Sequence, residues 1–146
     1  MWRDDGELFA MAREQLFTAV VGDIMDSLDL RHQFLPPEIQ PLHPEMVVIG
    51  RAMRVLERDV ERAPEKRFGL MLEALDDLKR HEVYVACGGD TPYALWGELM
   101  STRAMKLGAA GVVVNGYSRD TRGILQLGFP TFSTGRYGQD QRPRRQ

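Results

Sequence analysis

Arg119 and Asp120 are adjacent, oppositely charged residues that follow the apolar run 111–114 after a short turn. The carboxyl end of a buried strand is the usual place for ligands in α/β folds. An arginine presents a planar fork of donors that fits a carboxylate, and an aspartate offers oxygens that suit a hard divalent cation. Together they could hold and polarise a small keto acid, with Arg119 on its carboxylate and Asp120 on a metal.

A second candidate segment reads Gly97-Glu98-Leu99-Met100 and enters a predicted helix. Backbone N–H groups at the start of a helix bind anions, so Gly97 and the amides of Leu99 and Met100 are predicted to bind the substrate. Glu98 could bind a metal-bound water and help it act as an acid or base. A divalent metal, Mg²⁺ or Mn²⁺, would stabilise the negative charge that develops on the keto oxygen as an enolate forms.

A structural interpretation of the same pair is also available. Arg119 and Asp120 could form a surface ion pair, with Asp120 capping the helix that begins near Thr121. The residues alone leave both interpretations open.

Several better-known motifs fail in this chain. His81-Glu82 begins like a zinc-protease helix, but Val85 replaces the second histidine. Residues 116–120 begin like a nucleophile elbow, but Asp120 stands where a glycine is needed. The chain has no dinucleotide Gly-x-Gly-x-x-Gly and no phosphate-loop Gly-Lys-Ser/Thr, and its three histidines lack metal-ligand spacing. Dehydrogenase, ATPase and zinc-hydrolase functions therefore have little support.

Hydrophobic periodicity and turn residues predict the elements that would position these groups. Residues 31–45 contain four prolines and are predicted to be a loop, and residues 57–66 are predicted to be charged and exposed. The predicted helices are 7–16, 18–28, 68–79, 98–107 and 121–127. The predicted strands are 46–55, with an interruption at Gly50-Arg51, and 83–87, 112–115 and 130–133. Thr18 is the expected N-cap of its helix, whose inward residues would be Val20, Val21, Ile24, Met25 and Leu28. The alternation of strands and helices predicts an α/β fold with a partly parallel sheet.

Composition limits the class of protein further. The 146 residues are predicted to form one domain over 1–137 and a polar, Arg-rich, disordered tail over 138–146. The net charge of −2 gives no electrostatic reason to expect direct nucleic-acid binding. Cys87 cannot form an internal disulfide and is predicted to be a small core residue. No leader segment or membrane-spanning run is evident, so the cytoplasm is the expected compartment.

Spaced blocks in a consistent order carry a family resemblance. They are residues 18–23, 26–28, 48–52, 88–90, 96–100, 111–116, 119–120, 128–130 and 135–137. In these blocks the chain resembles the RraA-like family, which includes the class II 4-hydroxy-4-methyl-2-oxoglutarate aldolases. The resemblance implies a swivelling β/β/α fold and a homotrimer or hexamer with sites near subunit interfaces.

The resemblance also implies a chemistry. In the aldolase members, the arginine that matches Arg119 binds the pyruvate carboxylate, and the aspartate that matches Asp120 anchors Mg²⁺ or Mn²⁺. The turn that matches residues 98–100 completes the site. The implied reactions are retro-aldol cleavage of 4-hydroxy-2-oxo acids to pyruvate and decarboxylation of oxaloacetate, both through a pyruvate enolate.

The same family contains non-catalytic regulators that bind a protein partner such as a ribonuclease. The intact pair of Arg119 and Asp120 favours the enzyme over the regulator. Compared with the family, the chain is C-terminally short, because members continue past the position of Tyr137 with further strands and an acidic group. An incomplete version of the fold is therefore a third interpretation. The residues do not identify the physiological substrate or choose between Mg²⁺ and Mn²⁺.

Overall fold

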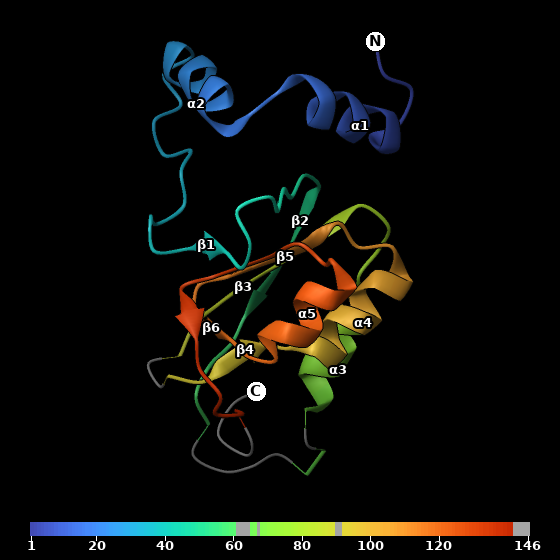
Figure 1. Cartoon of the computed structure of the whole chain (residues 1–146), viewed down its shortest axis with the longest axis vertical. Coiled ribbons are helices and arrows are strands. Elements are labelled where there is room, and N and C mark those ends of the chain that lie inside the picture. The colour runs from blue at the N-terminus through green and yellow to red at the C-terminus, as the bar shows by residue number, and fades with distance from the viewer. Residues whose placement is uncertain (61–64, 67, 90–91, 142–146) are drawn as a thin grey trace. The chain divides into compact units, whose positions relative to one another are not determined.

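The computed structural model describes residues 1–60, 65–66, 68–89 and 92–141. The chain divides into two compact units, Met1–Pro37 and Glu38–Gln146. Figure 1 labels the elements of both. The prediction of one domain over 1–137 stays a prediction.

The N-terminal unit contains helices α1 (Asp5–Gln15) and α2 (Thr18–Ser27). Asp4 caps α1, since its side chain accepts a hydrogen bond from the Glu7 amide at 2.9 Å. The prediction of Thr18 as an N-cap is wrong: Phe17 occupies that position without a side-chain cap bond, and Thr18 is already helical.

The apolar side of α2 is not a buried face. Val21, Ile24 and Leu28 are exposed, and the only buried residue of α2 is Gly22. The predicted inward set is therefore wrong for these three residues. Periodicity shows which side of a helix is apolar, but it does not show whether another element covers that side.

A five-stranded sheet organises the larger unit, in the order β1-β7-β5-β3-β2. Four of its strands are parallel, and β1 is antiparallel to β7. The strands are β1 (Gln40–Pro41), β2 (Arg51–Leu56), β3 (Glu82–Cys87), β5 (Gly111–Val114) and β7 (Thr131–Ser133). All four residues of β5 are buried, as expected for a central parallel strand. The predicted α/β class is confirmed.

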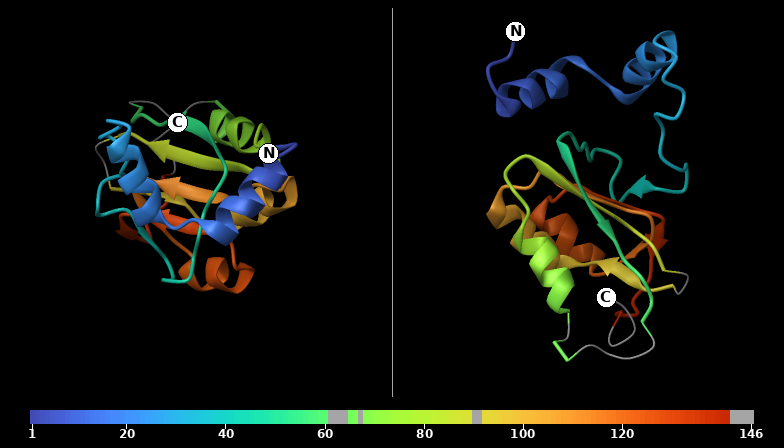
Figure 2. Two further views of the ribbon diagram at one scale, coloured as in Figure 1. Left: turned by 90° about the horizontal axis from the view of Figure 1, so that it is seen from above. Right: turned by 180° about the vertical axis from the view of Figure 1, so that it is seen from behind.

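Three helices follow one another beside this sheet, and Figure 2 shows α3 and α4 on one side of it. They are α3 (Gly69–Asp76), α4 (Glu98–Leu107) and α5 (Thr121–Leu127). The bounds of α4 and α5 are those predicted. Each ends at a glycine in the left-handed region, with φ of 82° at Gly108 and 66° at Gly128, where a side chain would be strained.

A second, three-stranded parallel sheet has the order β4-β6-β8 and was not predicted from the residues. Its strands are β4 (Ala94–Trp96), β6 (Tyr117–Ser118) and β8 (Gly135–Arg136). Trp96 and Ser118 are register partners, so the next residues, Gly97 and Arg119, leave the sheet side by side. This pairing brings together the two segments on which the functional prediction depends.

The core of the larger unit joins both sheets with helices α3, α4 and α5. Trp96 is 1% exposed, and its ring lies 5.0 Å from that of Tyr84 and 6.2 Å from that of Phe129. Ile124 of α5 and Ala104 of α4 are fully buried in the same cluster. Strand β4, which ends at Trp96, is thus held in place by contacts between large aromatic rings.

Several local predictions need correction. The strand predicted over 46–55, with an interruption at Gly50-Arg51, is a strand only in its second part, because β2 spans Arg51–Leu56. The predicted loop over 31–45 contains β1. Glu57, expected to be exposed, is 4% exposed, whereas Cys87, expected in the core, is exposed at the end of β3.

The first part of the predicted disordered tail, before Arg142, has defined contacts. The Gln139 carbonyl accepts a hydrogen bond from the Ala94 amide at 2.9 Å, Asp140 forms a β-bridge with Ala94, and Gln141 is 5% exposed. Gln139 and Asp140 therefore contact β4, and Gln141 contacts Met71 of α3. Residues 142–146, like Asp90 and most of the charged segment 61–67, lie outside the described residues. Among the described helices, none combines the length and apolar character needed to cross a membrane.

Candidate functional site

The N-terminus of α4 faces the residues that follow β6. Asp120 Oδ2 accepts a hydrogen bond from the Glu98 backbone amide at 3.3 Å. The carboxylate thus lies at the positive end of the α4 dipole. The next amides, of Leu99 and Met100, lie in the first turn, where no carbonyl of the same helix can reach them. This is the arrangement expected for an anion-binding helix start.

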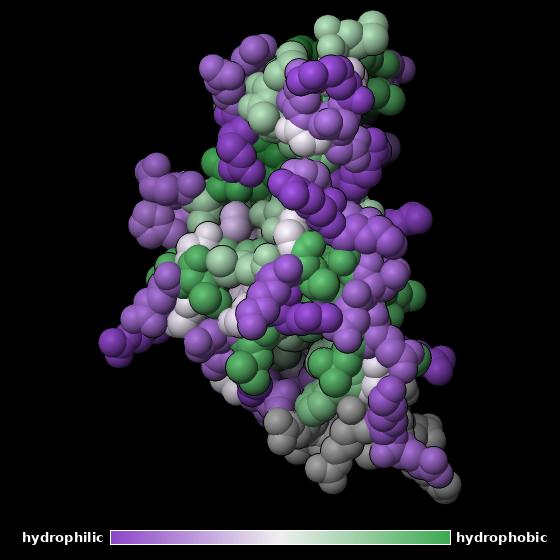
Figure 3. Space-filling model, turned by 90° about the vertical axis from the view of Figure 1, so that its right-hand side faces the viewer, coloured by the Kyte–Doolittle hydropathy of each residue, from purple (hydrophilic) through white to green (hydrophobic). Residues whose placement is uncertain are grey.

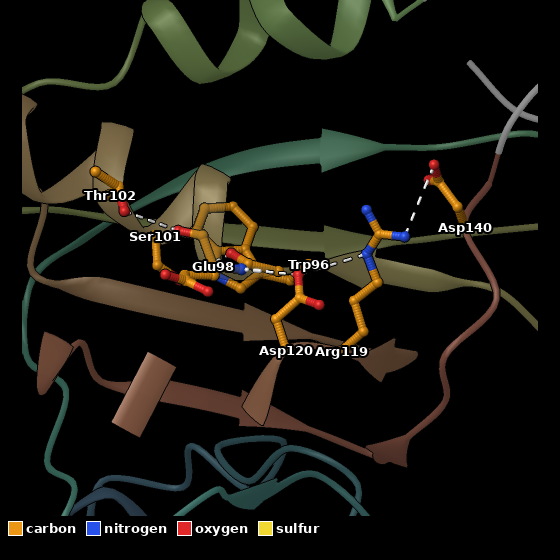
Figure 4. A network of polar contacts seen from close by, with 8 residues as sticks. Trp96, Glu98, Ser101, Thr102, Arg119, Asp120 and Asp140 are labelled. Carbon is orange, nitrogen blue, oxygen red and sulfur yellow. Dashed lines mark hydrogen bonds and ion pairs between the residues drawn. The ribbon is translucent and has the colours of Figure 1, made fainter. Parts of the chain in front are cut away.

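Arg119 lies between two carboxylates, as Figure 4 shows. Its Nε is 3.6 Å from Asp120 Oδ2, and one terminal nitrogen (NH1) is 3.7 Å from Asp140 Oδ2. The Arg119 backbone amide donates to the Trp96 carbonyl at 2.9 Å, which continues the pairing of β4 with β6. The Arg119 side chain remains 34% exposed, so a ligand carboxylate can reach its donors.

Asp120 has a backbone conformation that is uncommon for a residue with a side chain. Its φ is 56° and its ψ is 35°, in the left-handed region that aspartate tolerates better than most residues. It stands at the N-cap position of α5, but its side chain makes no cap hydrogen bond there. The interpretation of Asp120 as a simple helix cap is therefore wrong. The carboxylate points instead to the start of α4.

Gly97 allows this close approach. A Cβ atom at Gly97 would lie 2.7 Å from Asp120 Oδ2 and 3.4 Å from Arg119 Cγ. The Gly97 backbone is extended, with φ of −157°, so conformation alone does not demand glycine here. Glycine is favoured at position 97 because a side chain there would collide with the Asp120 carboxylate.

A buried hydrogen-bond chain supports the turn. Trp96 Nε1 donates to Ser101 Oγ at 2.7 Å, and Ser101 Oγ donates to the Gly97 carbonyl at 3.0 Å. Trp96 is 1% exposed and Ser101 is fully buried, so this chain is shielded from water. Thr102 forms a similar but more exposed bond, from its hydroxyl to the Glu98 carbonyl at 3.0 Å. These contacts fix the direction of the first turn of α4.

Most of the predicted site residues line one cavity of about 370 Å³. Those residues are Gly97, Leu99, Met100, Arg119 and Asp120. Glu98 is placed differently: its amide contacts Asp120, but its side chain lies against Gly123 of α5 and is not in the cavity wall. The structure brings the predicted residues together, and their chemical roles stay predictions.

The cavity also contains residues that sequence reasoning missed. Asp140 and Gln141 reach it from the segment expected to be a tail, and Asp76 and Arg103 form an ion pair of 2.8 Å between α3 and α4. The sequence carried no signal for Asp140, because its position depends on the isolated bridge to Ala94.

A family model described as RraA-like (Aldolase/RraA) matches residues 18–146. The chain belongs to the RraA-like family.

Two curated relatives of this RraA-like chain are similar over most of its length. One is "Putative 4-hydroxy-4-methyl-2-oxoglutarate aldolase" of Halalkalibacterium halodurans, 29% identical over 81% of this chain. The other is "Protein DlpA" of Legionella pneumophila, 27% identical over 82% of this chain. The matched region spans 52% of the first relative and 19% of the second.

Solved structures show the same fold. A crystal structure described as "novel cellulases from microbes associated with the gut ecosystem" has a TM-score of 0.87 and 28% identity, over 99% of this chain and 65% of that one. The structure of RraAS2 from Streptomyces coelicolor, described as an unusual member of the RNase ES inhibitor RraA family, has a TM-score of 0.79. It is 23% identical over 94% of this chain and 68% of that one. The RraA-like fold is thereby shown. The printed names of these relatives describe different functions, an aldolase in one case and a ribonuclease inhibitor family in another.

Asp120 is the residue predicted to hold a divalent cation, and its carboxylate has room for one. Its side chain is 43% exposed, so an oxygen remains accessible beside the bond to the Glu98 amide. Among the described residues, no group of three or more His, Cys, Asp or Glu side chains could hold a metal ion. Mg²⁺ commonly binds one or two carboxylates and takes its other ligands from water and substrate. The donor set therefore fits such an open site and does not fit a closed protein cage.

Proposed function

We propose that this chain is a divalent-metal-dependent lyase that acts on small 2-oxo acids. The reactions would be retro-aldol cleavage of 4-hydroxy-2-oxo acids to pyruvate, decarboxylation of oxaloacetate, or both. The observation that carries the proposal is the convergence of Arg119, Asp120 and the start of α4 on one cavity. The name of the aldolase relative from Halalkalibacterium halodurans supports it.

Arg119 would bind and orient the substrate carboxylate. The ion pairs of 3.6 Å and 3.7 Å hold the guanidinium at both ends, which reduces the rotamer freedom that is lost when a ligand binds. The amides of Leu99 and Met100 would add donors from the helix start. A substrate held in this way presents its keto group toward Asp120.

Asp120 would hold Mg²⁺ or Mn²⁺. When bound, the cation would supply positive charge that stabilises the negative charge developing on the keto oxygen. The bond from the Glu98 amide fixes one carboxylate oxygen of Asp120 and leaves the other for this task.

The remaining steps require proton transfer. In the retro-aldol direction the C4 hydroxyl loses its proton, the C3–C4 bond breaks, and its electron pair forms the C2–C3 double bond of the enolate. A proton then returns to C3 to give pyruvate. Because the Glu98 side chain lies against Gly123 and outside the cavity wall, it would exchange these protons through an intervening water.

The direct test measures pyruvate release from oxaloacetate by the purified chain, with Mg²⁺, with Mn²⁺ and with EDTA. Arg119→Lys should lower kcat/KM by about 10- to 100-fold, since a point charge replaces a bidentate fork. Asp120→Ala should abolish the metal-dependent part. Arg122→Lys is the matched control, because Arg122 is exposed on α5 and is not in the cavity wall. Turnover no faster than the metal ion alone, from a folded chain, would contradict the proposal.

A non-catalytic regulator that binds a protein partner is the alternative. Three exposed apolar residues of the N-terminal unit favour it, Val21 and Ile24 of α2 and Leu28 at its C-cap, because such side chains are typical of association surfaces. The homotrimer or hexamer implied by the resemblance would use the same kind of surface. Sedimentation of the purified chain, with Ile24→Gln beside it, separates self-association from binding to another protein.

A further inference from the structure

The cavity beside Arg119 is much larger than a pyruvate unit requires. Its volume of about 370 Å³ falls in the range, roughly 300–1,000 Å³, of pockets that bury whole drug-sized ligands. Arg119, Asp120 and Asp140 are among its lining residues, so it is continuous with the proposed carboxylate site. The part of the wall away from these charges therefore has room for a substituent of the substrate.

The wall away from Arg119 is mainly apolar, and α3 and α4 supply most of it. Figure 3 shows apolar side chains gathered among polar ones on the face where these helices lie. The apolar lining residues from the two helices and the turn before α3 are Phe68, Met71, Leu72, Leu75, Leu99 and Met100. Leu72 and Leu99 are respectively 46% and 83% exposed, so a ligand could remove apolar surface from water there.

The charges of this wall argue against a distal substrate carboxylate, farther along the substrate than the C4 carboxylate of oxaloacetate. Apart from Arg119, the cationic side chain among the described lining residues is Arg103. Arg103 Nε already donates to Asp76 Oδ1 at 2.8 Å, a shorter contact than either ion pair of Arg119. A distal carboxylate would meet Asp76 as well as Arg103, whereas an alkyl group would leave that pair intact.

Gln141 has a side-chain carbonyl oxygen that lacks a hydrogen-bond donor within the described residues. It is 5% exposed and lines the cavity, and its Nε2 contacts Met71 Sδ at 2.7 Å. Its Oε1 is buried and accepts no hydrogen bond within the described part of the chain. Buried acceptors are usually satisfied, so this oxygen would gain a partner from a ligand group that donates a hydrogen bond, such as a hydroxyl group.

We propose that the site selects 2-oxo acids that carry an apolar substituent beyond a hydroxyl group, and that it disfavours dicarboxylates longer than oxaloacetate, whose distal carboxylate would meet Asp76. The proposal rests on the proposed function and names its substrate class. Cleavage of the C3–C4 bond of such a 4-hydroxy-2-oxo acid gives pyruvate and an aldehyde or ketone with the apolar substituent. The C4 hydroxyl proton is lost as its oxygen becomes a carbonyl, and C3 gains a proton.

The first test measures binding without turnover. Unreactive 2-oxo acids from pyruvate to 2-oxooctanoate are titrated into the full chain with Mg²⁺ by calorimetry, beside the dicarboxylate 2-oxoglutarate. Affinity should rise about two- to fourfold for each added methylene that the cavity buries. 2-Oxoglutarate should bind more weakly than 2-oxohexanoate. A flat series, or tighter binding of 2-oxoglutarate, would overturn the proposal.

Two variants on α3 locate the effect. Leu72→Gln should reduce the gain per methylene, because Leu72 lines the cavity. Leu70→Gln is the matched control, because Leu70 lies on the same helix, is 58% exposed and lines a different pocket. Equal effects of the two variants would place the alkyl group elsewhere and contradict the proposal.

A third variant tests the hydroxyl partner. Gln141→Leu should remove a two- to tenfold preference for a 4-hydroxy-2-oxo acid over its deoxy analogue, the usual range for one hydrogen bond. An unchanged preference would refute this role of Gln141.

Failure of this inference is distinguishable from failure of the proposed function. Pyruvate release from oxaloacetate without any dependence of affinity on chain length would support the lyase and refute the apolar substrate class. Chain-length-dependent binding without release of pyruvate from any 4-hydroxy-2-oxo acid would refute the lyase and support the binding specificity.

Discussion

Replacing Gly97 by alanine tests whether the closeness of α4 to Arg119 and Asp120 matters for function. The new Cβ would lie 2.7 Å from Asp120 Oδ2, whereas carbon and oxygen normally approach to about 3.3–3.6 Å. The carboxylate would therefore move by about 0.7 Å. That movement breaks the 3.3 Å bond from the Glu98 amide and shifts the ion-paired Arg119.

The effects of Gly97→Ala on stability and on binding should differ in size. The extended backbone accepts alanine without strain, so the free energy of unfolding should fall by about 0.5–1.5 kcal/mol, the value of one hydrogen bond. The misplaced groups should reduce kcat/KM on oxaloacetate by about 100-fold, as a 1 Å displacement can do. Pyruvate release, calorimetry with pyruvate and Mg²⁺, and urea unfolding measure the three quantities.

Gly138→Ala is the control for this prediction, because a Cβ at Gly138 meets no atom within 4 Å. It should match the parent chain in every assay. Full activity of Gly97→Ala would refute the reasoning, since it would mean that Asp120 can leave the α4 amide without consequence. A loss of stability above about 3 kcal/mol, typical of core disruption, would instead show that Gly97 serves the fold.

Two further predictions concern stability. Ser101→Ala should lower the free energy of unfolding by about 1–3 kcal/mol, because it leaves the buried indole N–H of Trp96 without a hydrogen-bond acceptor. Thr102→Ala, at a more exposed bond, should lower it by less than about 1 kcal/mol. Equal losses of stability in urea unfolding would refute this ranking. Burial, with a smaller contribution from the charge of Glu57, raises the pKa of the Tyr84 phenol, so the unfolded chain loses this proton first as pH rises. Stability should therefore fall above about pH 10, by at most about 1.4 kcal/mol per pH unit from this group, and Tyr84→Phe should remove that part of the slope in alkaline unfolding titrations.

Local signals in the sequence were sufficient for part of this molecule. The bounds of α4 and α5 follow from apolar periodicity and from the glycines that end them, Gly108 and Gly128. The buried parallel strands β3 and β5 follow from continuous apolar runs. The position of Arg119 and Asp120 a few residues beyond the carboxyl end of β5 followed in the same way, because chain order fixes which end of a strand leads into the next turn, whereas β6, which directly precedes Arg119, was not predicted.

Only tertiary structure decided how these pieces form a site. The strands β4, β6 and β8 have three, two and two residues, too few to show a period of two, so their pairing could not be read locally. That pairing places Gly97 beside Arg119, and the bridge from Ala94 brings Asp140 to the same guanidinium. Burial also depends on non-local packing, which is why Glu57 and Cys87 were misjudged. The sequence by itself determined the fold class and the chemical groups available, whereas hydrogen bonds and packing between distant segments determined which of those groups meet.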